Sequence, residues 1–232
     1  MKFKITTVLL SLFCMSIALT ALTATPAFAE GPYWRVNGTR LEKGAKNTSI
    51  KGQTFTTKTT IAGASVEIKC ETAKGKSSTI EGNGINQGKG ASTLLFENCT
   101  EATPKGCVSS KAIETVGLDW SVGIIAIPTF PYIIAYAILF PQEGETLASV
   151  TISGCLAEGK YPITGSVAAE IIPEGEEVKE ATILFPEPAT TQIKLEGQLH
   201  KVGLVMGGGT ATLAGKLGMS LVSGEKFGVF KT

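Results

Sequence analysis

The stretch Ser65-Val66-Glu67-Ile68-Lys69-Cys70 alternates strictly between polar and apolar residues. Successive side chains of an extended strand point to opposite faces, so Val66, Ile68 and Cys70 share one face. The pattern predicts a half-buried β-strand that ends in a cysteine directed at the core. Glycine, threonine and serine are abundant in the rest of the chain, and long blocks at helical spacing are missing. The composition therefore favours strands and turns throughout.

Other segments support the same fold class. Asn37-Gly38 stands between Tyr33-Trp34-Arg35-Val36 and Thr39-Arg40-Leu41, which is the usual sequence of a hairpin with a type I′ turn. Residues 81–90 hold four glycines and two asparagines, and we expect a loop there. Further strands are predicted at residues 92–99, 147–154, 161–172 and 227–230.

The most apolar stretch after the N-terminal segment runs from Val116 to Phe140. Two β-branched runs in it flank Pro128-Thr129-Phe130-Pro131, which predicts a hairpin buried on both faces. The alternative is a transmembrane helix. Two prolines in its centre, together with Asp119-Trp120, argue against that alternative.

A short internal repeat occurs in the last third of the chain. Leu195-Glu196-Gly197-Gln198-Leu199 recurs as Leu213-Ala214-Gly215-Lys216-Leu217, with a Gly207-Gly208-Gly209 turn between the two copies. Glycine inside a strand marks a bend or a close approach of backbones. We expect two neighbouring strands that curve a sheet, as a barrel or a sandwich requires.

Residues 1–29 have the three regions of a signal peptide. Lys2 and Lys4 form a basic start, an apolar run follows, and Ala27-Phe28-Ala29 supplies a cleavage site. We therefore expect a signal peptide at 1–29 and a secreted β domain at 30–232, located outside the cell or at the cell envelope. No stable transmembrane helix is expected after cleavage.

Four cysteines remain after the predicted cleavage: Cys70, Cys99, Cys107 and Cys155. An even number in an exported protein indicates two disulfides. Of the three possible pairings we prefer Cys70–Cys99 with Cys107–Cys155; the alternative joins Cys99 to Cys107 across a short turn. A zinc site is disfavoured because no C-x2-C pair is present.

Ionisable chemistry is sparse. Loss of Lys2 and Lys4 leaves 19 basic residues against 20 acidic ones, so no positive field exists to attract nucleic acid. The mature chain holds one histidine, His200, and one aspartate, Asp119, and no nucleophile motif surrounds any serine. We expect no catalytic residue, no cofactor and no metal site. The acidic segment 173–177 is expected to be a solvated turn and not a calcium site.

The chain resembles a set of uncharacterised exported actinobacterial proteins that are rich in β-structure. The resemblance is carried by Val36-Asn37-Gly38, Gly63-x-x-Val66-x-x-x-Cys70, Phe96-x-x-Cys99, Thr210-Ala211-Thr212-Leu213-x-Gly215 and Phe227-Gly228-Val229. It implies a secreted β-rich domain in which Cys70 pairs with Cys99. It implies no functional residue, because this family has no assigned activity.

The sequence thus predicts an all-β protein of about 200 residues, a disulfide-stapled sandwich or barrel. Its alternative organisation is two lobes, residues 30–110 and 111–232. The leading hypothesis for function is a non-catalytic extracellular or cell-envelope protein with a binding or structural role and an unidentified partner.

Two alternatives are kept. A secreted hydrolase of the glycosidase type would use two carboxylates across a cleft, from the candidates Glu67, Glu71, Glu97, Glu170 and Glu196. A membrane-inserting β protein would show an apolar outer band at 122–140. A pocket lined only by apolar groups would instead favour binding of a ligand or lipid.

Overall fold

The computed structural model describes residues 31–83, 88–103, 106–126, 133–186, 191–195 and 198–231. The predicted signal peptide lies outside these residues. The described part of the chain is built of strands and contains no helix, which confirms the all-β prediction. The strands are β1 (Tyr33–Val36), β2 (Thr39–Arg40), β3 (Lys43–Ile61), β4 (Ala64–Asn83), β5 (Gly88–Thr103), β6 (Val108–Ser109), β7 (Ala112–Glu114), β8 (Leu118–Ala126), β9 (Ile133–Pro141), β10 (Thr146–Ser153), β11 (Gly159–Ile172), β12 (Glu180–Phe185), β13 (Thr191–Leu195), β14 (Gln198–Met206), β15 (Gly209–Leu221) and β16 (Phe227–Phe230).

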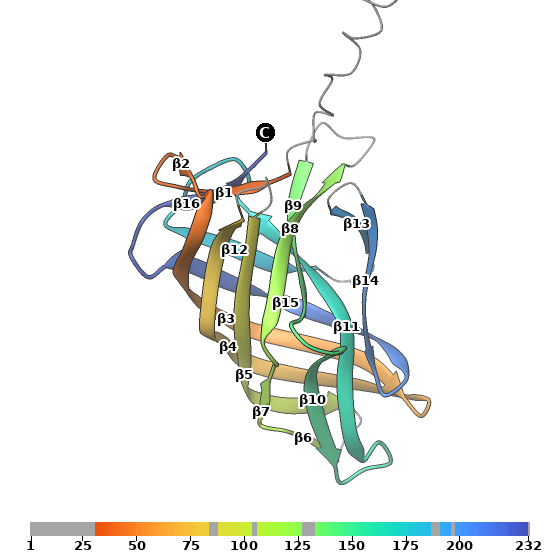
Figure 1. Ribbon diagram of the computed structural model, residues 1–232. Coiled ribbons are helices and arrows are strands. Elements are labelled where there is room, and N and C mark those ends of the chain that lie inside the picture. Colours follow the sequence, from red (N-terminus) through yellow and green to blue (C-terminus); the bar gives the residue numbers. More distant parts are fainter. Residues whose placement is uncertain are drawn as a thin grey trace, which may run out of the picture. The chain divides into compact units, whose positions relative to one another are not determined.

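Eight strands close into an antiparallel barrel (Figure 1). Around the ring β8 pairs with β9, β9 with β11, β11 with β12, and β12 with β15. The ring continues from β15 to β3, β4 and β5, and β5 pairs with β8 again. Closure satisfies the backbone groups that an open sheet leaves at its edges. Strands from both of the lobes expected at 30–110 and 111–232 therefore share one barrel.

Three of the ring strands, β5, β11 and β15, continue beyond the ring and meet different partners. Toward the end of the molecule where β6 and β10 lie, β14 replaces β12 between β11 and β15. On the other side β10 pairs with β11, β7 pairs with β5, and a bridge between Thr115 and Ala148 joins the two. The barrel is thereby extended, and its interior is continuous along the long strands.

A row of irregularities crosses the barrel wall; we call Thr54, Asn98 and Gly215 the waist. Thr54 and Asn98 have positive φ angles of 55° and 53°, and the register of β15 against β3 shifts between Ala214 and Lys216. An irregularity of this kind bends a strand and redirects its side chains. The buried residues of β3 and β5 have even numbers before the irregularity and odd numbers after it, and the alternation of buried residues is also interrupted in β4. The residues that show this are Thr48, Ile50, Phe55 and Ile61 in β3; Ile68, Cys70 and Ala73 in β4; Leu94, Phe96 and Cys99 in β5.

The strand predicted from residues 65–70 is part of β4. Val66, Ile68 and Cys70 are all buried on its inner face, as the alternation indicated. Cys70 lies directly opposite Cys99 of β5. The cysteine that ends this strand therefore meets its partner at the waist.

A three-stranded sheet of β1, β2 and β16 packs against one end of the barrel. The Asn37-Gly38 turn joins β1 to β2 with φ angles of 47° and 78°, so the predicted hairpin is confirmed. Trp34 of β1 is buried, its ring centroid lies 5.5 Å from that of Trp120, and its Nε1 donates to Lys89 O at 2.9 Å. The sheet therefore contributes a large apolar side chain to the core at this end.

The loop expected at residues 81–90 is wrong at both of its described ends, which belong to β4 and β5. A side chain at Gly88 would meet Trp34, and one at Gly90 would overlap Trp120. The glycines make room for the two indoles and do not mark a loop.

The apolar stretch forms two strands and not a helix in its described part. β8 pairs with β9 over nine residues, as the hairpin prediction required. The connecting residues 127–132 lie outside the described part of the chain. Within the residues that the structure describes, no helix has the length and apolar character needed to cross a membrane.

The repeat does not correspond to two equivalent strands. Its first copy spans the connection between β13 and β14, where Leu195 pairs with Gln198, whereas its second copy lies within β15. The Gly207-Gly208 turn is confirmed, because Met206 pairs with Gly209. Gly215 has the predicted bending role within a strand, whereas Gly197 lies outside the described residues.

Candidate functional site

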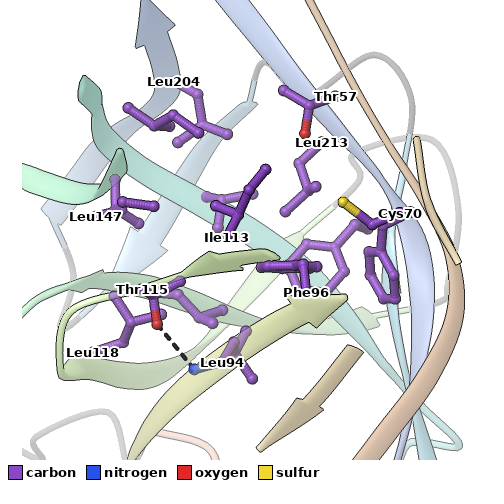
Figure 2. A pocket seen from close by; sticks show the side chains of 16 residues that line it. Thr57, Cys70, Leu94, Phe96, Ile113, Thr115, Leu118, Leu147, Leu204 and Leu213 are labelled. Atoms are coloured by element: carbon purple, nitrogen blue, oxygen red, sulfur yellow. Dashed lines mark hydrogen bonds between the residues drawn. The ribbon is translucent and has the colours of Figure 1, made fainter. Parts of the chain in front are cut away.

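An apolar cavity lies inside the barrel at the level of the waist (Figure 2). Its volume is about 60 Å³, which is several times the space that one water molecule needs. Eleven strands or their ends contribute to its wall, so the closed ring creates the site. Its lining residues are Phe55, Thr57, Cys70, Leu94, Phe96, Ile113, Thr115, Leu118, Leu139, Leu147, Ala148, Ile163, Val167, Phe185, Leu204 and Leu213.

Three phenylalanine rings form part of the wall. The Phe55 ring centroid lies 5.2 Å from that of Phe96 and 6.2 Å from that of Phe185, both in edge-to-face arrangements. Edge-to-face pairs of this kind add stability beyond the area they bury. A Cβ atom at Gly215 would overlap the Phe55 ring, so the waist glycine allows Phe55 to take this position.

Thr57 and Thr115 contribute the hydroxyl groups of the lining. The Thr115 Oγ1 accepts a hydrogen bond from Leu94 N at 2.9 Å, and Thr115 N donates to Leu94 O at 2.9 Å. The described lining residues include no carboxylate, ammonium, guanidinium or imidazole group. Because a charged group loses its hydration in such a place without compensation, the cavity suits apolar atoms.

A second hollow, which we call the outer groove, lies on the outside of the wall at the waist. Its volume is about 420 Å³. It is lined by Gln53, Thr54, Leu184, Phe185, Pro186, Ala214, Gly215 and Lys216. Phe185 lines both the cavity and the outer groove, so this one buried residue borders both hollows.

Both preferred disulfides are present. Cys70 bonds to Cys99 and Cys107 bonds to Cys155, with separations of 29 and 48 residues, so the alternative Cys99–Cys107 pairing is wrong. Cys70 also lines the cavity. Two disulfides fit an oxidising compartment. Among the residues that the structure describes, no cluster of histidine, cysteine, aspartate and glutamate has the arrangement of a metal site.

The described candidate carboxylates line neither hollow. Glu67 pairs with Lys69 at 3.2 Å, and Glu97 pairs with Lys74 at 2.8 Å. Glu71 lies on the strand next to Glu97 and accepts from Asn98 Nδ2 at 3.0 Å. Glu170 lies near Tyr136, where burial and the Glu170 charge raise the pKa of the phenol. Glu196 lies outside the described residues.

His200 and Asp119 have separate environments. His200 is exposed on β14, and Asp119 Oδ1 on β8 accepts a hydrogen bond from Gln142 Nε2 at 2.8 Å. The structure therefore gives Asp119 a partner other than the histidine.

The acidic segment 173–177 is only partly solvated, so the expected solvated turn needs correction. It packs beside β16, where Glu174 forms a bridge with Val229. Burial raises the pKa of Glu174, while a hydrogen bond from the Ala135 backbone and the Lys231 charge act in the opposite direction. Glu177 accepts from Gly38 N at 2.8 Å and lies 3.5 Å from the Arg35 Nε.

Sequence reasoning missed the cavity because no local pattern marks it. Each lining residue taken alone has the character of an ordinary core position, and the wall exists only after eleven separate segments come together. Comparisons of the chain with models of protein families, with curated proteins and with solved structures each gave no match. The resemblance to exported actinobacterial proteins therefore stays a prediction.

Proposed function

We propose that the mature chain is a non-catalytic, exported β-barrel protein that binds a small apolar molecule in its internal cavity. The observation that carries this proposal is the lining: sixteen residues surround about 60 Å³, and thirteen of them are aliphatic or aromatic. Removing apolar surface from water is the main driving force for filling such a space. The two threonine hydroxyls allow at most a weak polar contact.

The alternative hydrolase is less well supported. That mechanism needs two carboxyl groups facing each other across a cleft. Glu67, Glu97 and Glu71 instead have lysine or asparagine partners. Among the described residues that line the cavity and the outer groove, none has a carboxylate.

The alternative of membrane insertion expects an apolar outer band at 122–140. In the described part of that stretch, Val122, Ala135, Ala137 and Leu139 are buried within the barrel core. Ile138 points outward but is covered by Val202 of β14. These five apolar side chains therefore have partners within the protein.

Export of the chain belongs to the same proposal. The basic start, apolar run and Ala27-Phe28-Ala29 site of residues 1–29 support secretion, and the two disulfides support a destination outside the reducing cytoplasm. We place the mature chain outside the cell or at its envelope, with no nucleic-acid partner.

Filling the cavity tests the binding proposal. Ala148 lines the cavity and is buried, so Ala148→Leu places three additional carbon atoms in the space. We expect 1-octanol to bind the unaltered protein with one saturable site in isothermal titration calorimetry. The Ala148→Leu protein should bind at least tenfold more weakly, because the added side chain occupies the same volume.

Ala112→Leu provides the matched control, since Ala112 is exposed on β7 and outside the lining. It should bind 1-octanol as the unaltered protein does. Equal affinity of the Ala148→Leu and Ala112→Leu proteins would contradict binding in this cavity. Circular dichroism confirms that both variants keep the barrel.

A further inference from the structure

We propose that the ligand is an anionic amphiphile with one short unbranched chain, whose chain fills the cavity and whose anionic group lies in the outer groove beside Lys216. This inference rests on the proposed binding function and adds the chemical class of the ligand and its orientation. It also places a passage between the outer groove and the cavity at the Phe185 side chain, through which the ligand enters.

The two hollows meet at one point of the barrel wall. Phe185 is the last residue of β12 and pairs with Gly215, where the β12–β15 ladder ends. Beyond this point β15 has β14 as its neighbour, but that pairing begins only at Ala211. Among the described residues, 212–214 therefore have no ladder partner on this side. The described part of the wall is interrupted where the groove and the cavity share Phe185.

Gly215 makes the wall thin at the same place. It carries no side chain, it lines the outer groove, and the space that its Cβ would occupy is filled by Phe55 of the cavity wall. In this proposal the Phe185 side chain, which is buried and packed against Phe55, moves aside to join the two hollows.

The polar character of the two hollows differs. The part of the chain that the structure describes gives the cavity no charged group, whereas it gives the outer groove Gln53, Thr54 and the ammonium group of Lys216. Lys216 is exposed, and within the described part of the chain its ammonium forms no hydrogen bond or ion pair. Among the described residues that line the groove it is the one charged residue, and its ammonium group attracts an anion.

The sizes set the length of the chain. A space of about 60 Å³ holds about four to six groups of the size of water or methylene. A ligand whose chain has six to eight carbon atoms would fill the cavity and still place its head group in the groove. A carboxylate, sulfate or phosphate head would have the same attraction to Lys216, and octanoate serves as the probe.

The test compares octanoate with 1-octanol by titration calorimetry at low ionic strength. Two unit charges about 4 Å apart in water attract with an energy that corresponds to about fivefold in affinity. We expect Lys216→Met to weaken octanoate about fivefold and to leave 1-octanol unchanged. Lys160→Met is the matched control, because Lys160 is an exposed lysine of β11 that lines neither hollow.

A second pair of variants tests the passage. Ala214 lines the outer groove, so Ala214→Trp should slow the association of both probes at least tenfold in stopped-flow measurements that follow tryptophan fluorescence. Thr210→Trp is the control, since Thr210 is exposed on the same strand and outside the lining. Unchanged association rates in the Ala214→Trp protein would overturn the assigned passage.

The outcomes separate the two proposals. Binding of both probes with equal affinity, unaffected by Lys216→Met, would overturn the anionic amphiphile and leave the cavity function in place. Binding of neither probe would overturn the cavity function itself. Weaker octanoate binding in the Lys160→Met protein as well would show a general charge effect and would also overturn the role of Lys216.

Discussion

Gly215 leaves space at the waist for the Phe55 ring, and its replacement by alanine tests the packing of the barrel most directly. A Cβ atom there would lie 2.6 Å from Cε1 of Phe55, closer than carbon atoms approach in folded proteins. Phe55 is only 1 % exposed and is packed against Phe96 and Phe185, so the cavity that it lines is the one direction in which its ring can yield. The strain must be shared between the ring and the backbone of β15.

The magnitude follows from overpacking. An additional methyl group in a well-packed core costs about 1–3 kcal/mol, and replacing glycine by alanine recovers about 0.4–1 kcal/mol from the unfolded chain. We expect Gly215→Ala to lower the free energy of unfolding by about 1–2 kcal/mol. For a chain of this length, that lowers the Tm by about 2–8 °C in differential scanning calorimetry.

Gly203→Ala is the matched control, because no atom lies within 4 Å of the Cβ position at Gly203. Its stability should equal or exceed that of the unaltered protein. Phe55→Leu removes the ring that the methyl group meets, so it should reduce the effect of Gly215→Ala in a double-mutant cycle. Equal stabilities of the Gly215→Ala and Gly203→Ala proteins, or strict additivity in the cycle, would refute this description of the waist.

The remaining predictions concern the disulfides and one carboxyl group. In denaturant titrations, replacing both Cys107 and Cys155 by serine should lower the free energy of unfolding by about 4 kcal/mol, and replacing both Cys70 and Cys99 should lower it by about 3.5 kcal/mol. The Cys107–Cys155 bond closes the longer loop, so it restricts the entropy of the unfolded chain more. A non-reduced peptide map that joins Cys99 to Cys107 would contradict the pairing. Burial raises the pKa of Glu174 above its ordinary value of 4.5, so the folded state favours the protonated carboxyl group. As the pH rises from 4.5 through the folded pKa, this carboxyl group ionises and the free energy of unfolding decreases. Glu174→Gln should therefore gain stability relative to the unaltered protein between about pH 4 and pH 7 in thermal unfolding; a difference that does not change with pH would oppose this assignment.

Local pattern was sufficient for much of the secondary structure. Alternation over 65–70 predicted a strand and its inward face, and Asn37-Gly38 predicted a hairpin turn, because both signals act between neighbours in the sequence. The hairpin of β8 and β9 was also found from two β-branched runs around prolines. The even number of cysteines indicated two disulfides, while their pairing required a choice among three.

Local sequence patterns did not predict the irregularities at the waist or the strand pairings that close the barrel. Thr54 and Asn98 adopt positive φ angles although neither is glycine, and these positions interrupt the alternation on which strand prediction depends. Gly88 and Gly90 have the composition of a loop, yet they are strand residues, since the two tryptophans that need the space are distant in sequence. The pairings that close the ring, such as β5 with β8, depend on many such choices together.

The candidate site depends on that closure and has the same limit. Leu204 and Leu213 lie on different strands from Phe96 and Ile113, and only the closed barrel brings them to one cavity. Their residue types do not distinguish a ligand-binding wall from an ordinary core. A volume that remains unfilled after folding is a property of the packed structure and not of any segment.

The central claim is that this interior volume is a binding site for apolar atoms. Methyl-resolved nuclear magnetic resonance of the mature protein during titration with 1-octanol tests it most directly. The account predicts saturable shifts confined to the lining methyl groups, with Ile113, Ile163, Leu204 and Leu213 among the largest. Shifts spread over exposed methyl groups such as those of Val108 and Leu156, with none at the lining, would contradict it.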